Sequence, residues 1–102
     1  MKIVQLPQAL VDLIETAEYL AQDDIEVADR FFDAFEKTLG DIQNAPKIGT
    51  IRKFRGQTDI RMWFVDGFEK SLIFYTENVE EIVILRVIHA SRDYTRFFPD
   101  RG

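Results

Sequence analysis

An apolar run near the C-terminal end of the chain reads Ile82-Val83-Ile84-Leu85-Arg86-Val87-Ile88. Its length and its β-branched residues are typical of a buried strand. Strict alternation gives this strand two apolar faces, with Val83, Leu85 and Val87 on one and Ile82, Ile84 and Ile88 on the other. Only one face can meet helices of the same chain. The second must therefore be covered by the C-terminal tail, by a partner, or by both.

Two further runs with strand character precede this one. Residues 60–65 and 72–75 are rich in aromatic and β-branched side chains, and Asp66-Gly67 after the first run is a strong hairpin signal. Residues 47–57 contain Gly49 and Gly56 together with several basic residues, and we expect a loop there.

The N-terminal half predicts a short strand followed by two helices. Residues 2–6 are β-prone, and Pro7 fits the first turn of a helix. Apolar positions 10, 13, 14, 17, 20 and 21 form one stripe, with Asp12, Glu15 and Glu18 off it. Asp23 and Glu26 resemble a capping pair for a second helix that ends near Pro46. The apolar face of that helix consists of Ala28, Phe31, Phe32, Phe35, Leu39 and Ile42.

The element order is therefore β-α-α-β-β-β, which indicates an α+β fold. We expect a helical hairpin packed on one face of a mainly antiparallel four-stranded sheet. With 102 residues, the chain is predicted to be a single domain spanning residues 1–102.

Composition limits the classes of function. There is no Cys, no apolar run approaches the roughly 20 residues of a membrane span, and the N-terminus lacks a secretory apolar stretch. We therefore expect a cytoplasmic protein. The net charge of −5 is uneven, because residues 1–46 hold three Lys/Arg against ten Asp/Glu. This acidic total argues against tight direct binding to nucleic acid, although a basic strip after residue 46 keeps a phosphate or carboxylate partner open.

The segment from Ile84 to Asp93 reads Ile84-Leu85-Arg86-Val87-Ile88-His89-Ala90-Ser91-Arg92-Asp93. It resembles the signature near the end of ParE-type toxins of the RelE/ParE superfamily, which is a strand ending in Arg-Val-Leu-His, two small residues, then Arg-Asp. Further similar segments occur in the family's order along nearly the whole chain: Asp12-Leu13-Ile14, Tyr19-Leu20-Ala21, Ala28-Asp29-Arg30-Phe31, Pro46-Lys47-Ile48-Gly49 and Leu72-Ile73-Phe74-Tyr75.

This resemblance implies a toxin of a type II toxin–antitoxin (plasmid stabilisation) system. Such a toxin is neutralised by a ParD-like antitoxin, a ribbon-helix-helix dimer whose flexible C-terminal segment wraps the toxin. ParE-type toxins are understood to stall DNA gyrase on cleaved DNA, whereas the RelE branch cuts mRNA in the ribosome. A third reading is a non-toxic module that only binds antitoxin.

A RelE-type ribonuclease needs a base, an acid and cations around the scissile phosphate. The candidates for these roles are Arg61, Arg86, His89, Arg92 and Tyr94. Against this reading stand the net charge and the apolar second sheet face, so a gyrase inhibitor that is not itself an enzyme is favoured. His89 also fits a plain role at a strand end. Arg86 either holds Asp93 or another carboxylate inside the fold, or awaits an acidic antitoxin residue.

Two surfaces are expected to bind partners. The antitoxin surface comprises Arg61, Trp63, Ile84, Arg86 and Ile88. The target surface comprises Lys47, Arg52, Lys53, Arg55, Tyr94, Phe97 and Phe98, although these residues also fit a solvated loop and a tail that packs on the sheet. No motif indicates a metal, a cofactor or a small-molecule ligand, and none is expected.

Overall fold

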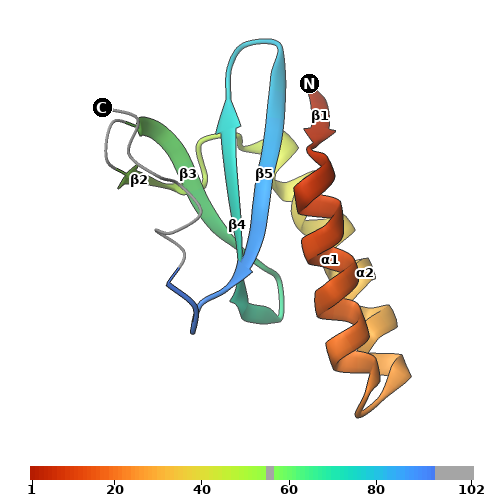
Figure 1. The fold of residues 1–102 in the computed structure, drawn as a ribbon. Coiled ribbons are helices and arrows are strands. Elements are labelled where there is room, and N and C mark those ends of the chain that lie inside the picture. The colour runs from red at the N-terminus through yellow and green to blue at the C-terminus, as the bar shows by residue number, and fades with distance from the viewer. Residues whose placement is uncertain (55–56, 94–102) are drawn as a thin grey trace.

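Strand β5 (Glu81–His89), which contains the apolar run, lies inside a five-stranded sheet ordered β1-β5-β4-β3-β2 in this computed structural model (Figure 1). The structure describes residues 1–54 and 57–93, without the side chains of 54, 57 and 58. The remaining elements are β1 (Lys2–Gln5), α1 (Pro7–Ala21), α2 (Ile25–Asn44), β2 (Thr50–Phe54), β3 (Gln57–Val65) and β4 (Phe68–Glu77). Strand β1 pairs with β5 in parallel and the other pairs are antiparallel, so the predicted α+β class is confirmed.

The strand count differs from the prediction, because part of the expected loop at residues 47–57 is strand β2. Thr50 pairs with Met62 and Ile51 pairs with Arg61, so β2 forms one edge of the sheet. Basic residues interrupt the alternation of apolar side chains in β2, so the sequence pattern did not predict a strand there. Charged residues are common on edge strands, where they discourage pairing with other chains.

Residues at the N-terminal ends of the two helices account for where each helix begins. Pro7 occupies the first helical position of α1, as predicted. The cap of α2 is Asp24 and not Asp23, because the Asp24 side chain accepts the Glu26 N–H at 2.9 Å. Helix α2 ends at Asn44, just before Pro46, as expected.

The turn between β3 and β4 confirms the hairpin signal of Asp66-Gly67. Gly67 has a φ of 80°, a left-handed conformation that glycine adopts without strain. The Asp66 N–H donates to the buried Thr38 hydroxyl of α2 at 2.9 Å. This contact fixes the turn against the helical hairpin.

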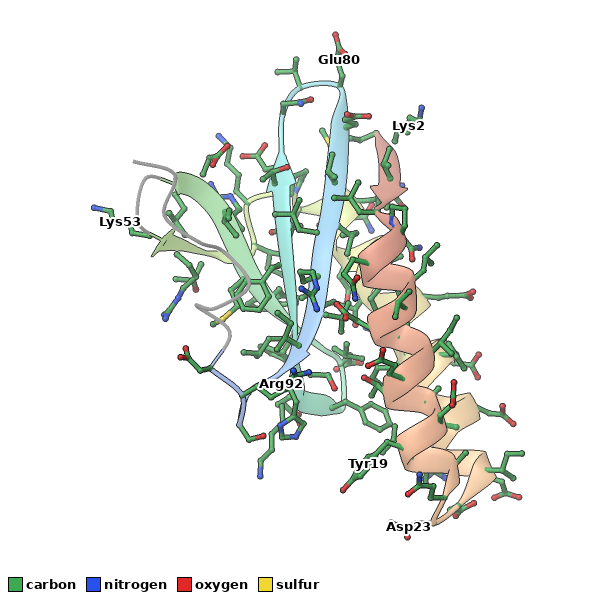
Figure 2. The ribbon with its side chains drawn as sticks, viewed as in Figure 1. Lys2, Tyr19, Asp23, Lys53, Glu80 and Arg92 are labelled. Carbon is green, nitrogen blue, oxygen red and sulfur yellow. The ribbon has the colours of Figure 1, made fainter. Side chains whose placement is uncertain are left out.

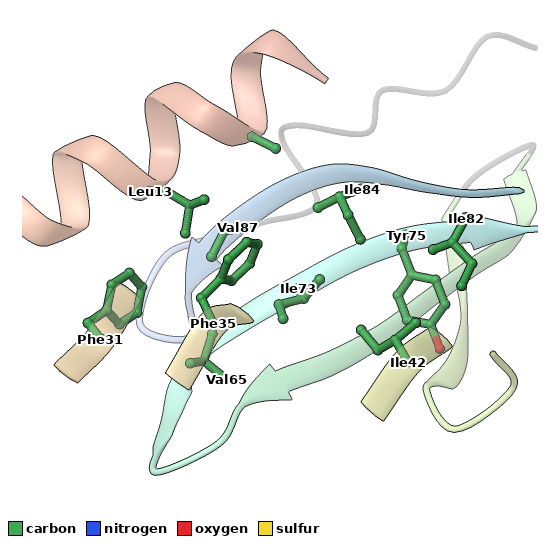
Figure 3. Packing of buried hydrophobic residues seen from close by; sticks show 11 residues of the cluster. Leu13, Phe31, Phe35, Ile42, Val65, Ile73, Tyr75, Ile82, Ile84 and Val87 are labelled. Atoms are coloured by element: carbon green, nitrogen blue, oxygen red, sulfur yellow. The ribbon is translucent and has the colours of Figure 1, made fainter. Parts of the chain in front are cut away.

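The main core lies between the helical hairpin and one sheet face, as Figure 3 shows. Leu13 of α1 and Phe31, Phe35 and Ile42 of α2 point toward sheet residues such as Ile73. A second buried cluster belongs to the opposite face and consists of Ile60, Leu72, Phe74 and Ile88, with Met62, Phe64 and Leu85 against it. Both clusters are buried within this single chain.

A bulge in β5 corrects the faces that strict alternation predicted. Tyr75 pairs with Ile84 and the preceding Phe74 pairs with Arg86, so Leu85 is an extra residue in β5. Val87 therefore joins Ile84 in the core under the helices. Ile88 instead joins the opposite cluster, beside Leu85.

Two predictions about helix faces were wrong in part. In α1, Leu10 and Ile14 are exposed, whereas Ala9 and Asp12 are buried beside Leu13 and Ala17. In α2, Phe32 is 40% exposed, while Phe31 and Phe35 are buried as predicted. The buried face of α1 is therefore rotated from the predicted stripe toward Ala9 and Asp12, whereas α2 buries the predicted face except for Phe32.

Candidate functional site

The guanidinium of Arg86 binds a carboxylate of α1. Its Nε and Nη2 atoms donate to the two Asp12 oxygens at 2.8 and 3.0 Å, a forked geometry typical of strong arginine–carboxylate pairs. Asp12 is only 8% exposed. The reading in which Arg86 holds a carboxylate inside the fold is thus confirmed, with Asp12 in that role.

Asp12 also completes the hydrogen bonding of the sheet edge. Strand β1 ends at Gln5, so β5 has no neighbouring strand beyond Ile84, where α1 begins to run alongside. The Val87 N–H donates to Asp12 Oδ2 at 2.9 Å, which satisfies a buried backbone donor. One carboxylate therefore serves both the Arg86 side chain and the backbone of β5.

Arg61 is held at a different place, near the start of the basic strip. Its Nη1 donates to the Gly49 carbonyl at 2.8 Å and to the Lys47 carbonyl at 3.3 Å. Its Nε lies 3.6 Å from Glu77 Oε1. Arg61 thus ties the segment between α2 and β2 to strands β3 and β4.

Tyr75 of β4 also binds the segment between α2 and β2. Its hydroxyl donates to the Pro46 carbonyl at 2.8 Å and accepts the Gly49 N–H at 2.9 Å. Burial raises the pKa of this hydroxyl above its ordinary value, so it stays a neutral donor at physiological pH. Both ends of the Pro46–Gly49 segment are thus hydrogen-bonded to one tyrosine, a link that the spacing of the sequence did not reveal.

The basic strip begins at this anchored segment. Lys47 and Lys53 are exposed, Arg52 is half-buried, and Arg55 lies outside the described residues. In Figure 2, Lys53 projects from the sheet edge far from Asp23, which lies at the tip of the helical hairpin. Lys53 of the strip thus lies on a sheet edge remote from the tip of the acidic helical hairpin.

His89 and Arg92 lie at the C-terminal end of β5. His89 Nδ1 accepts the Ser91 N–H at 3.0 Å and lies 2.7 Å from Ser91 Oγ. Both His89 and Arg92 line a pocket of about 350 Å³ together with Asp12, Thr16 and other residues, but neither Arg61 nor Arg86 lines it. Tyr94, Phe97 and Phe98 lie outside the described residues. Among the described residues, Arg61 is thus apart from the other candidates, whereas Arg86 is linked to the pocket of His89 and Arg92 through Asp12.

The apolar members of the predicted antitoxin surface lie at different depths. Ile84 is fully buried in the main core, and Ile88 is buried in the cluster on the opposite face. Trp63 is half-buried and packs against the main core, while its neighbours Met62 and Phe64 pack on the opposite face.

Comparison with known proteins gives one family. A family model described as the ParE toxin of the type II toxin–antitoxin system, parDE, matches residues 3–94. No curated protein matches the chain significantly. Neither helix in residues 1–54 is long and apolar enough to cross a membrane, and no other described segment is a helix.

Proposed function

We propose, since this chain belongs to the ParE toxin family of type II toxin–antitoxin systems, that it poisons DNA gyrase in the cytoplasm and is held inactive by a ParD-like antitoxin. The family match spans nearly the whole chain, so the toxin would be a single domain of residues 1–102. In this proposal the protein acts by binding the gyrase–DNA complex and catalyses no reaction of its own.

The engagement of the two central arginines is the observation that favours gyrase over the ribosome. A ribonuclease needs guanidinium groups whose N–H donors already face the site of the developing phosphorane charge. Arg86 is instead committed to Asp12, and Arg61 to the Gly49 carbonyl. The net charge of −5 is also unfavourable for docking against ribosomal RNA.

For the antitoxin, we propose that its C-terminal segment folds as it binds and lies along the groove between the sheet and the helices. Such coupled folding can cover a large surface despite its ordering cost. Direct contact would fall on Arg61 and the half-buried Trp63. Ile84 and Ile88 were also expected on this surface, but both are buried, Ile84 in the main core and Ile88 on the opposite face of the sheet, so neither is open to direct contact. An acidic antitoxin residue that reaches Arg86 would compete with Asp12.

For the target, we propose the cationic edge formed by Lys47, Arg52, Lys53 and Arg55, together with Tyr94, Phe97 and Phe98. Its support is electrostatic, because gyrase presents DNA phosphates where it holds a cleaved duplex. The strip also begins at a segment that Tyr75 and Arg61 fix in place, which lowers the ordering cost of binding.

The test is inhibition of gyrase supercoiling by the purified protein and by two matched charge reversals. Lys53→Glu on edge strand β2 should raise the half-inhibitory concentration severalfold. Lys2→Glu makes the same charge change on the opposite edge strand, β1, and should leave inhibition unchanged. Equal effects of both reversals would refute the placement of the target surface.

Absence of any supercoiling inhibition by folded wild-type protein would refute gyrase as the target. Cleavage of mRNA by the same protein on translating ribosomes would then establish the RelE-type activity. His89 and Arg92 would be the first residues to substitute in that case, because they line the same pocket.

A further inference from the structure

Three side chains of β3 and β4 meet next to the segment that leads from α2 into β2. Arg61 pairs with Tyr75 across the two strands, and Glu77 lies two residues further along β4, on the same face of the sheet. Ile51 of β2 pairs with Arg61 from the other side. Tyr75 and Arg61 bind the backbone of the segment directly, whereas Glu77 is linked to it through Arg61.

Different atoms of the Arg61 guanidinium meet Glu77 and the segment. Its Nε lies 3.6 Å from Glu77 Oε1, while its Nη1 donates to the Gly49 and Lys47 carbonyls at 2.8 and 3.3 Å. Because the guanidinium is rigid and planar, a carboxylate that holds Nε also fixes the direction of the Nη1 donors. Glu77 therefore acts on both carbonyls through Arg61.

The ion pair of Arg61 and Glu77 is shielded from water. The two side chains are 15% and 19% exposed, whereas those of the Lys37–Asp41 pair on α2 are 61% and 41% exposed. Water and salt screen an exposed pair, so it contributes little, but a shielded charge that loses its partner is costly. Loss of the Glu77 charge would thus favour other positions of the Arg61 guanidinium, nearer to water.

The segment that Arg61 holds is continuous with the cationic edge. Lys47 lies within this segment, and Thr50 follows it directly as the first residue of β2, which also carries Arg52 and Lys53. Strand β2 is at the edge of the sheet and has β3 as its neighbour. The positions of these cations therefore depend on the pairing with β3 and on the segment before β2.

We propose that Glu77 is a positioning residue of the target surface. By holding Arg61, it keeps the segment from Pro46 to Gly49 and the adjoining cations in the geometry that binds the gyrase–DNA complex. This role rests on the proposed function, because those cations are the proposed target surface. Its expected sign is opposite to that of simple repulsion. An acid beside a cationic surface should weaken binding to DNA phosphates, yet here removal of the acid weakens binding.

The first test is inhibition of gyrase supercoiling, without antitoxin, by the full chain and two neutralised variants. Glu77→Gln should raise the half-inhibitory concentration about twofold to tenfold, which is the ordering cost of one long side chain expressed as affinity. Glu80→Gln makes the same charge change three residues away, on the exposed β4–β5 turn, and should not weaken inhibition. Inhibition by Glu77→Gln that equals or exceeds that of wild type would overturn the proposal.

The second test is amide hydrogen exchange, which does not involve gyrase. The Gly49 N–H donates to the Tyr75 hydroxyl, and the Asp66 N–H donates to the Thr38 hydroxyl at the β3–β4 turn. Glu77→Gln should speed exchange severalfold at Gly49 and leave Asp66 unchanged. Equal acceleration at both amides would mean a general loss of stability, and unchanged exchange at both would mean that Glu77 positions nothing. Either result would overturn the proposal.

A double-variant cycle tests whether Glu77 acts through Arg61. In an Arg61→Gln background, Glu77→Gln should cause no further loss of inhibition, whereas additive losses would contradict the proposal. Arg61→Lys replaces Arg61→Gln in the cycle if circular dichroism shows that the latter is unfolded, because Lys keeps the charge and lacks the planar fork.

Failure of the proposed function is distinguishable from failure of this role for Glu77. Absence of inhibition by folded wild-type protein would refute gyrase as the target, and the positioning role toward gyrase with it. Inhibition by wild type that Glu77→Gln matches would refute the positioning role alone.

Discussion

A single carboxylate, Asp12, joins the first helix to the last strand. It receives two hydrogen bonds from Arg86, one from the Val87 N–H and a longer one, at 3.3 Å, from the side-chain amide of Gln8 on the same helix. Taking a charged pair out of water is costly, and such a pair persists only when its geometry and hydrogen bonds are good. Asp12 meets both conditions.

We predict that Asp12→Asn destabilises the fold by about 3 kcal/mol, because it removes the charge that faces the mostly buried Arg86. Urea unfolding measures this change through the midpoint and slope of the transition. Glu15→Gln is the control, since it removes a charge from an exposed position of the same helix and should cost less than about 0.5 kcal/mol. Similar losses in both variants would show that Asp12 contributes only surface charge.

The Tyr75 hydroxyl predicts a loss of stability at alkaline pH. Burial raises its pKa above the unfolded value of about 10, so the folded chain retains a proton that the unfolded chain releases. The contribution of Tyr75 is complete below about pH 10 and falls as the pH rises toward the folded pKa.

Urea unfolding of wild type and Tyr75→Phe across this pH range measures that contribution. The wild-type free energy of unfolding should fall more steeply than that of Tyr75→Phe, which has no hydroxyl to ionise. Parallel curves for the two proteins would mean that Tyr75 titrates alike in both states.

At the scale of elements, the segment between α2 and β2 packs closely against its neighbours because Gly49 has no side chain. A Cβ at Gly49 would lie 2.7 Å from the Tyr75 hydroxyl oxygen and 3.1 Å from Arg61 Cβ. Both neighbours already hold this segment through hydrogen bonds. Any side chain at position 49 must therefore displace the start of the cationic edge.

We predict that Gly49→Ala lowers the free energy of unfolding by about 1–3 kcal/mol, through overpacking and strain on the Tyr75 hydrogen bonds. Gly40→Ala is the matched control, because a Cβ at Gly40 in helix α2 meets nothing within 4 Å. That change should stabilise the helix by up to about 1 kcal/mol. Destabilisation of the same size in both variants would contradict the role assigned to Gly49.

The sequence predicted elements well where one physical signal dominated. Pro7, the Asp66-Gly67 turn and the aromatic face of α2 each marked a real feature. Strand β2 escaped notice because its register depends on β3, a partner distant in the chain. The bulge at Leu85 likewise follows from pairing with β4, and pairing leaves no local trace in composition.

The site was harder to predict than the fold for the same reason. Asp12 lies 74 positions from Arg86 in the chain, and only the docking of α1 along β5 brings the two together. Ala9 and Leu13 on either side of Asp12 could have indicated its burial, but Leu10 and Ile14 drew the predicted stripe toward solvent. Gly49 and Tyr75 were each noted, but not as partners.

At the scale of the whole molecule, charge is divided between two ends. The helical hairpin is acidic, whereas edge strand β2 carries Arg52 and Lys53, and Lys53 lies far from the hairpin tip at Asp23 (Figure 2). A toxin of this family must bind an antitoxin and a target. Surfaces of opposite sign allow different partners to be drawn to different sides.

We propose that this toxin traps DNA gyrase on DNA that the gyrase has cut. The most direct measurement is the amount of gyrase cleavage complex on plasmid DNA, with ATP, in the presence and absence of the purified protein. We predict a rise with added protein, reversed by its antitoxin. An unchanged level, with protein that is folded and still binds its antitoxin, would contradict the claim.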